Sequence, residues 1–205
     1  MSRIDETIAM DRRRFLRAAL GGGALLAVGG SIALPRLLAA GAGGGLPALV
    51  HDQPGEVALE CFSDDGRDLG VRQVQRLVLT DAQWRSRLSP LAFDVMRRAG
   101  TERAFSGPHE RPAQPGLFRC VACATALYNA TTEFDSGTGW PSFWRPIAKR
   151  NVIETRDDSF GIERIAVSCA GCDSHLGHVF DDGPQPTGLR YCMNSVALRF
   201  IPRTA

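Results

Sequence analysis

Residues 168–195 read SCAGCDSHLGHVFDDGPQPTGLRYCMNS and hold three of the six cysteines and two of the four histidines in the chain. The stretch runs from a Cys-x-x-Cys turn through His-x-x-His into an apolar strand that carries one more cysteine. So dense a group of soft and titratable side chains seldom serves packing alone. We therefore interpret this stretch as the part of the chain that the other segments position.

The six cysteines divide by spacing. Two Cys-x-x-Cys pairs, separated by 45 residues, can bring four thiolates into the tetrahedron that zinc favours. Four sulfur ligands leave no open coordination position, so such a Zn²⁺ site is structural and not hydrolytic. Two disulfides, a thioredoxin-like redox pair and iron in a rubredoxin-like site are the alternatives. The expected ligands are Cys120, Cys123, Cys169 and Cys172.

Cys192 becomes a candidate nucleophile once four cysteines are assigned to a metal. Side chains alternate along a strand, so Arg190 and Asn194 project to the same side as Cys192. An arginine on that face favours the thiolate, and we expect the pKa of Cys192 to lie below the free value of about 8.5. His175 and His178 can supply protons to a developing oxyanion. A buried, inert cysteine is the simpler alternative.

The flanking sequence predicts short strands. Gly and Pro interrupt the chain every few residues from Thr101 onward, which favours a small antiparallel β domain with long loops over an α/β nucleotide-binding fold. Aromatic residues on a Gly/Pro turn, such as Trp140, commonly line a small apolar pocket, although core packing is the commoner role. The expected strands cover residues 57–62, 71–79, 116–119, 152–157, 163–168 and 190–201.

Two short helices are expected between the second and third of these strands. The first covers residues 81–88 behind Thr80, and the second covers residues 90–99 behind Ser89, with a glycine just past its end. Each begins with a side chain that can accept a hydrogen bond from the first turn. The packing face expected for the second helix consists of Leu91, Val95 and Ala99.

The positive charge of the chain is concentrated at the N-terminus. The formal net charge is +2, but residues 1–42 hold six arginines against three acidic residues, which leaves 18 basic and 19 acidic residues elsewhere. A nearly neutral body gives no reason to expect nucleic acid as a partner. With 205 residues, the chain is long enough to bury a substantial core.

The arginine-rich N-terminus resembles a twin-arginine export signal. Arg12 and Arg13 precede Phe15 and Leu16, and an uncharged Gly/Ala/Leu run ends in small residues near position 42. An uncleaved membrane anchor is the alternative, but glycines interrupt an apolar run that is already short for a bilayer. We expect a signal segment at 1–42, a linker at 43–56, a catalytic domain at 57–205, and a periplasmic or other extracytoplasmic location.

From about Thr80 to Ile201, the chain resembles the methionine sulfoxide reductase B family. The matching motifs are GTERAFSG (100–107), CVAC (120–123), FDSGTGWPSFW (134–144), CAGCDSHLGHVFDDGP (169–184) and GLRYCMNSVALRF (188–200). The resemblance implies a mainly β fold in which two antiparallel sheets lean together as a β-tent, with short flanking helices and zinc on the paired cysteines. It also implies that Cys192 attacks the sulfur of methionine R-sulfoxide to give a sulfenic acid.

The resemblance also implies roles for the neighbours of Cys192. Trp140 is expected to receive the methyl group of the substrate, and Arg190 to support the thiolate. His175, His178 and Asn194 are expected to orient water and polar groups around the sulfoxide, with a protonated His178 as the proton donor. The implied partners are oxidised proteins and a thioredoxin-like reductant. We expect a monomer that meets the membrane only if the signal stays uncleaved.

One position departs from the family pattern. Many relatives carry a resolving cysteine where this chain has Thr138, which cannot attack a sulfenic acid. Cys61 is the remaining unassigned thiol, and we hypothesise that it forms a disulfide with Cys192 that an external dithiol then reduces. The alternative is an inert Cys61, with an external thiol reducing Cys192 directly. Two other classes compete: a zinc-clipped module that binds oxidised or methionine-rich segments without turnover, and a disulfide oxidoreductase acting through the Cys-x-x-Cys pairs.

Overall fold

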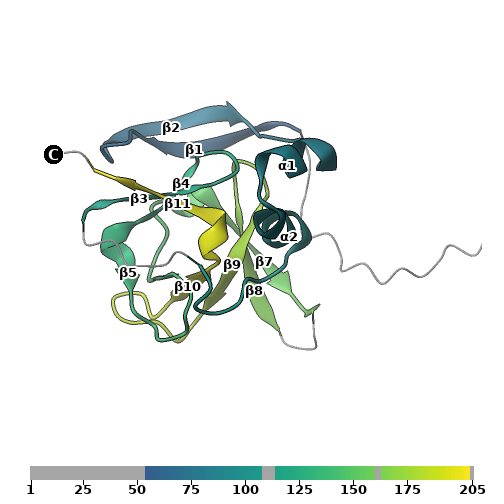
Figure 1. The fold of residues 1–205 in the computed structure, drawn as a ribbon. Coiled ribbons are helices and arrows are strands. Elements are labelled where there is room, and N and C mark those ends of the chain that lie inside the picture. The colour runs from purple at the N-terminus through teal and green to yellow at the C-terminus, as the bar shows by residue number, and fades with distance from the viewer. Residues whose placement is uncertain (1–53, 108–113, 160–162, 204–205) are drawn as a thin grey trace, which may run out of the picture. The chain divides into compact units, whose positions relative to one another are not determined.

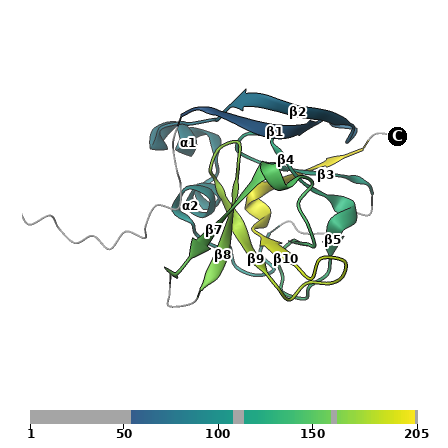
Figure 2. The same cartoon turned by 180° about the vertical axis from the view of Figure 1, so that it is seen from behind.

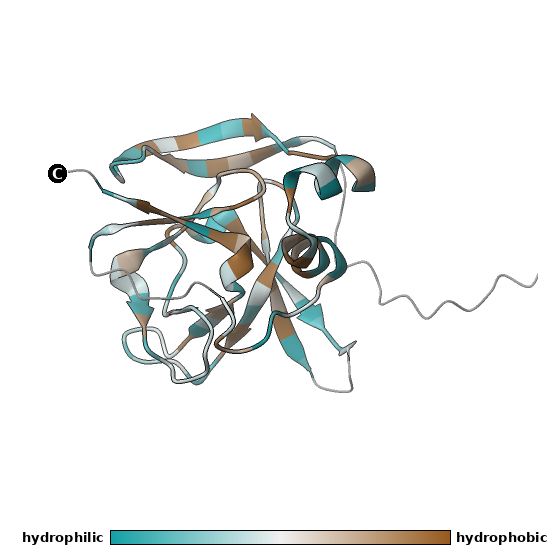
Figure 3. Ribbon diagram, in the orientation of Figure 1, coloured by the Kyte–Doolittle hydropathy of each residue, from teal (hydrophilic) through white to brown (hydrophobic). Residues whose placement is uncertain are grey.

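The computed structural model describes residues 54–107, 114–159 and 163–203. They begin with an antiparallel hairpin of β1 (Glu56–Phe62) and β2 (Asp68–Gln75). Its turn passes through Gly66, whose φ of 80° suits glycine. Figure 3 shows apolar and polar residues mixed along both strands, and Leu69 and Val71 of β2 remain exposed. The hairpin confirms the first predicted strand, while the second begins and ends earlier than predicted.

Two helices follow the hairpin, as predicted. In α1 (Asp81–Arg87), the Thr80 side chain accepts a hydrogen bond from the backbone of Gln83, and the Gln83 side chain accepts one from the Thr80 N–H in return. In α2 (Pro90–Arg98), the Ser89 side chain accepts a hydrogen bond from the N–H of the third residue. The caps that sequence reasoning identified therefore do fix where both helices begin.

The predicted packing face of α2 is wrong at Leu91, and Ala99 lies just past the end of the helix. Leu91 is 46% exposed, whereas Val95 is fully buried. The helix has a second apolar row beside the predicted one, and α2 packs against β9 and the turn after β10. Spacing alone does not choose between two adjacent apolar rows, so the choice is made by tertiary packing. The buried residues are Ala92, Phe93, Val95 and Met96.

The largest sheet has six antiparallel strands in the order β5-β6-β10-β9-β8-β7. Strand β10 carries the candidate nucleophile and lies inside the sheet, between β6 and β9 (Figures 1 and 2). The strands are β5 (Glu133–Phe134), β6 (Ser142–Phe143), β7 (Val152–Asp157), β8 (Arg164–Cys169), β9 (His175–Phe180) and β10 (Arg190–Met193).

A three-stranded antiparallel sheet in the order β11-β3-β4 completes the fold. Its strands are β3 (Gly116–Cys120), β4 (Ala126–Asn129) and β11 (Leu198–Pro202). The predicted single strand over 190–201 is therefore wrong. A 3-10 turn, η4 (Ser195–Ala197), separates β10 from β11 and passes the chain from one sheet to the other. The mainly β, antiparallel architecture with short helices is confirmed, and the hairpin adds a third sheet.

The core lies where the two larger sheets meet. The ring of Phe143 stacks on Tyr128 with centroids 4.2 Å apart and meets Phe118 edge-on at 5.0 Å. These three aromatic residues come from β6, β4 and β3, so they join both sheets. Among the described residues, no helix has the length and hydrophobicity needed to cross a membrane. The predicted signal segment and most of the predicted linker lie outside the described residues.

Candidate active site and metal centre

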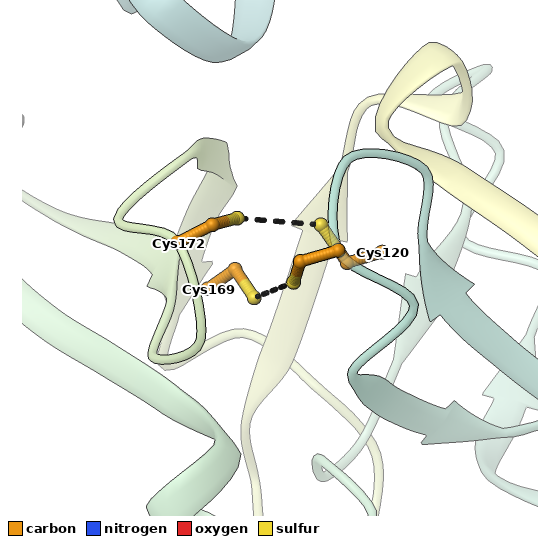
Figure 4. A group of neighbouring side chains, drawn as sticks. Cys120, Cys169 and Cys172 are labelled. Atoms are coloured by element: carbon orange, nitrogen blue, oxygen red, sulfur yellow. Dashed lines mark hydrogen bonds between the residues drawn. The ribbon is translucent and has the colours of Figure 1, made fainter. Parts of the chain in front are cut away.

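Four sulfur atoms converge from two turns (Figure 4). The Sγ atoms of Cys120 and Cys172 are 3.7 Å apart, those of Cys123 and Cys169 are 3.5 Å apart, and all four lie within 4.8 Å of one another. Zinc bonded to sulfur at about 2.3 Å would place the ligands about 3.8 Å apart in a tetrahedron. The cluster therefore fits a Cys₄ metal ion, and all six cysteines of the chain are free of disulfides.

Local backbone geometry shapes both turns of the cluster. Each turn follows the end of a strand, and each ends in a residue of positive φ, Ala124 at 63° and Asp173 at 54°. Gly171, within the second turn, lies against the first, because a Cβ there would be 2.4 Å from the Thr125 hydroxyl and 3.2 Å from Cys123 Sγ. The side chain of Asp173 accepts a hydrogen bond from Arg76 at 2.7 Å, which fastens the second turn to the segment after β2.

Cys192 lies on the same sheet face as residues from two neighbouring strands. The strand register pairs it with Ser142 on β6 and with His178 on β9, and directly paired residues project to the same side. Thr138, from the loop before β6, places its Oγ1 at 4.0 Å from Cys192 Sγ. The structure thus surrounds this half-buried thiol with two hydroxyl groups and an imidazole.

The predicted low pKa of Cys192 is wrong. Burial raises the pKa of the thiol, and the opposing effects of Arg190, Thr138 and Ser142 are not enough to reverse it. The Arg190 guanidinium also pairs with a carboxylate, because it donates two hydrogen bonds of 2.8 Å to Asp182. These bonds raise the pKa of Arg190. Sequence spacing placed Arg190 correctly, but it could not reveal the burial of Cys192 or the pairing of Arg190 with Asp182.

His178 is oriented by a carboxylate that sequence reasoning missed. Its Nε2 lies 2.8 Å from Oδ2 of Asp157, a residue at the end of β7 that is only 4% exposed. Burial tends to raise the pKa of Asp157, but hydrogen bonds from Ser159 and His178 and the charge of Arg164 together hold it well below the ordinary value. An ionised carboxylate only accepts, so His178 donates through Nε2, and Nδ1 is the acceptor nitrogen of the neutral ring.

Both histidines have pKa values below the ordinary 6.5. Burial lowers the pKa of His175 to about 4, and lowers that of His178 despite the opposing pull of Asp157. Neither is therefore mainly protonated near neutral pH, contrary to the expectation of a protonated His178. The rings meet edge to face with centroids 5.2 Å apart. His175 is almost fully buried, and neither of its ring nitrogens has a hydrogen-bond partner among the described residues.

Glu102, in the loop after α2, links the other predicted site residues. Its carboxylate accepts hydrogen bonds from the Ser195 N–H at 2.6 Å, the Ser195 hydroxyl at 3.0 Å and the Val196 N–H at 3.1 Å, which fixes the turn after β10. Its backbone carbonyl accepts a hydrogen bond from Trp140 Nε1 at 3.2 Å. Sequence reasoning noted only the GTERAFSG motif that contains Glu102 and assigned it no role.

Both ends of the Asn194 side chain are already engaged. Its Oδ1 accepts a hydrogen bond from the Glu102 N–H at 2.9 Å, and its Nδ2 donates to the Leu176 carbonyl at 3.0 Å. The amide is only 3% exposed, so it holds the two segments around β10 in place. This arrangement gives Asn194 a positioning role next to the thiol.

The structure does not bring Cys61 to Cys192. Strand β1, which carries Cys61, and β10 lie at opposite ends of the molecule in both views (Figures 1 and 2). Cys61 lines a cavity of about 530 Å³ together with Leu59, Arg119 and Cys123, which belongs to the four-cysteine cluster. That cavity contains no residue of the site around Cys192. The hypothesised disulfide between the two cysteines therefore does not fit the folded arrangement.

A closed four-sulfur cluster, combined with a separate thiol facing histidines, is the arrangement of a thiol-dependent enzyme with a structural metal site. Residues 88–202 match the SelR domain family. The chain is 50% identical over 131 residues to the peptide methionine sulfoxide reductase MsrB of Pseudomonas syringae pv. syringae, covering 64% of this chain and 100% of that protein. It is 51% identical over 130 residues to the MsrB of Pseudomonas putida strain W619, covering 63% and 98%. The chain belongs to the SelR domain family.

Proposed function

We propose that this protein is a peptide methionine sulfoxide reductase that uses Cys192 as its nucleophile and acts on the R epimer. Family membership supports the overall reaction. The observation that carries the catalytic assignment is the position of Cys192, which is half-buried on an inner strand and directly opposite His178. A thiol so placed can meet a substrate while the surrounding sheet excludes most of the water.

The reaction transfers one oxygen atom from the sulfoxide to Cys192. The Cys192 sulfur attacks the sulfur of the sulfoxide, the S–O bond breaks, and the oxygen and the thiol proton end on Cys192 as a sulfenic acid while methionine leaves. Because the pKa of Cys192 is raised by burial, the thiol retains its proton until substrate arrives. Neutral His178 presents its acceptor nitrogen Nδ1, which relays this proton to the sulfoxide oxygen. Asp157 keeps the ring in the tautomer that the relay requires.

Two further residues orient the substrate. Trp140 is held through its indole N–H by the Glu102 carbonyl, which leaves the ring to receive the methyl group. Neither buried ring nitrogen of His175 has a hydrogen-bond partner in the described part of the chain, so the ring offers a hydrogen bond to the sulfoxide oxygen. Holding the methyl group, the oxygen and the side-chain stem in different places is what selects one epimer at sulfur.

An external thiol donor, of the thioredoxin-like class, then reduces the sulfenic acid. Thr138 lies next to Cys192 and has no thiol to offer, and β1, the strand that carries Cys61, lies far from β10 in both views. The donor must therefore reach Cys192 itself. Disulfide mapping of protein oxidised by substrate would test this step, because a linkage between Cys61 and Cys192 would contradict it.

We further propose that Zn²⁺ occupies the four-cysteine cluster and that residues 1–42 direct twin-arginine export to an extracytoplasmic compartment. The sulfur geometry supports zinc as a structural ion, which would supply cross-linking and no catalytic chemistry. The Arg12-Arg13 pair and the apolar run after it support export. Cell fractionation of a variant with both arginines changed to lysine should find the protein retained in the cytoplasm. An unchanged distribution would reject the export proposal.

The decisive experiment compares Cys192→Ser with Cys61→Ser as its matched control. Each variant is assayed on a peptide containing methionine R-sulfoxide, with dithiothreitol as reductant. Cys192→Ser should lose at least about 1,000-fold in kcat/KM, since loss of a nucleophile is among the largest single effects on catalysis. Cys61→Ser should retain turnover. Comparable activity of Cys192→Ser and the wild type would reject the nucleophile assignment.

A further inference from the structure

Phe105 combines two features that are unfavourable for an ordinary loop residue. Its side chain is 78% exposed, more than any other large hydrophobic residue in the described part of the chain. Its φ is 61°, in the left-handed region that L-residues other than Asn and Asp rarely adopt. A glycine at this position would remove both the exposed apolar surface and the backbone strain. Folding therefore does not account for the ring, and its presence suggests a role in function.

The protein holds this ring in a defined place. The Phe105 N–H donates a hydrogen bond to the Gly139 carbonyl at 2.9 Å. The ring lies against Gly139, where an added Cβ would be 2.6 Å from Phe105 Cδ2. On the other side, the Ser106 N–H and hydroxyl donate to the Arg103 carbonyl at 3.2 and 2.7 Å and close the turn. The backbone at Phe105 is therefore fixed, and the exposed ring rests on Gly139.

The place where the ring is held adjoins the reactive thiol. Gly139, which Phe105 contacts, has Thr138 on one side and Trp140 on the other. Thr138 lies 4.0 Å from Cys192 Sγ, and Trp140 is hydrogen-bonded to Glu102. The exposed face of Phe105 is thus at the rim of the site, next to the residue proposed to receive the substrate methyl group.

We propose that Phe105 is a specificity residue that contacts the polypeptide on either side of the methionine sulfoxide. An exposed, rigid aromatic ring beside a reactive thiol loses little conformational freedom when an apolar side chain of the substrate covers it. Free methionine sulfoxide has no flanking residues and gains nothing from this contact. The inference rests on the proposed function and extends it to the choice between peptide-bound and free substrate.

Kinetics on two substrates test the proposal. Wild type, Phe105→Ala and Phe105→Tyr are compared on free methionine R-sulfoxide and on a peptide with leucine on each side of the sulfoxide. Phe105→Ala should lower the ratio of kcat/KM for peptide over free substrate by about fivefold to tenfold, mainly through KM. Phe105→Tyr keeps the ring and should keep the ratio.

Each other outcome has a defined meaning. An unchanged ratio in Phe105→Ala would overturn the proposal, whether both activities fall together or neither changes. Phe105→Gly, which relaxes the left-handed backbone, gives the same comparison if the alanine variant folds poorly. A wild-type protein that reduces neither substrate would instead reject the proposed function, so the two failures are distinguishable.

Discussion

Replacing Glu102 with glutamine tests the hydrogen-bond network around the strand that carries Cys192. The carboxylate is 3% exposed and accepts three hydrogen bonds from Ser195 and Val196. Hydrogen bonds to a charged group contribute about 1.5 to 3 kcal/mol each, and an orphaned buried donor costs about 1 to 3 kcal/mol. Glutamine has one acceptor oxygen, so it leaves at least one backbone N–H unpaired and weakens the remaining bonds.

We therefore expect Glu102→Gln to lower the free energy of unfolding by about 2 to 4 kcal/mol. In a domain of this size the change corresponds to a fall in Tm of about 5 to 15 °C. The matched control is Glu163→Gln, because Glu163 is 64% exposed and pairs with an equally exposed arginine. The control should change the free energy by less than about 0.5 kcal/mol.

Urea unfolding followed by tryptophan fluorescence and by circular dichroism measures both variants. A shifted midpoint with an unchanged slope would report a loss of stability and not a change in the unfolded state. If Glu102→Gln lost less than about 1 kcal/mol, the carboxylate would not be fixing the turn after β10, and the reasoning from its three hydrogen bonds would fail.

Two other predictions concern the metal centre and pH. Removing zinc with a chelator, or changing Cys172 to serine, should lower the free energy of unfolding by about 5 kcal/mol or more, because metal binding stabilises only the folded chain. Metal analysis should find one zinc in the wild type and in the Cys61→Ser control, and a fully stable, metal-free wild type would contradict this. For His175, the folded pKa of about 4 lies below the ordinary 6.5, so the unfolded chain takes up the proton first as the pH falls. Its contribution of about 3 kcal/mol is complete above about pH 6.5 and is lost as the pH falls toward about 4. Urea midpoints at about pH 7 and about pH 4.5 should therefore differ less in His175→Gln than in the wild type, and equal differences would refute the assignment.

Sequence reasoning succeeded where the relevant physics is local. The caps at Thr80 and Ser89 determine the starts of α1 and α2 through hydrogen bonds within one turn. The Cys-x-x-Cys spacing likewise predicts a sulfur cluster, because two sulfurs of each pair are already close within a single turn. Alternation along β10 predicted that Arg190 and Cys192 share a face, and both are partly exposed while Tyr191 between them is buried.

The failures all involve contacts between distant segments. The pKa of Cys192 depends on burial by the rest of the sheet, which local spacing does not show. The partner of His178 comes from β7, twenty-one residues earlier in the chain. The break between β10 and β11 depends on Glu102, more than ninety residues before Ser195. These features require the tertiary fold, and no pattern within a single segment could have predicted them.

The four sulfur atoms of the cluster are unevenly buried, and this affects how well the protein resists oxidation. Cys120, Cys169 and Cys172 are buried, whereas Cys123 is partly open to the 530 Å³ cavity. Hypochlorite and peroxides, which generate methionine sulfoxide, also attack exposed thiolates. In the proposed zinc site, Cys123 is thus the ligand most open to oxidants, and the shielding of that one sulfur would set how long the metal link between β3 and β8 lasts.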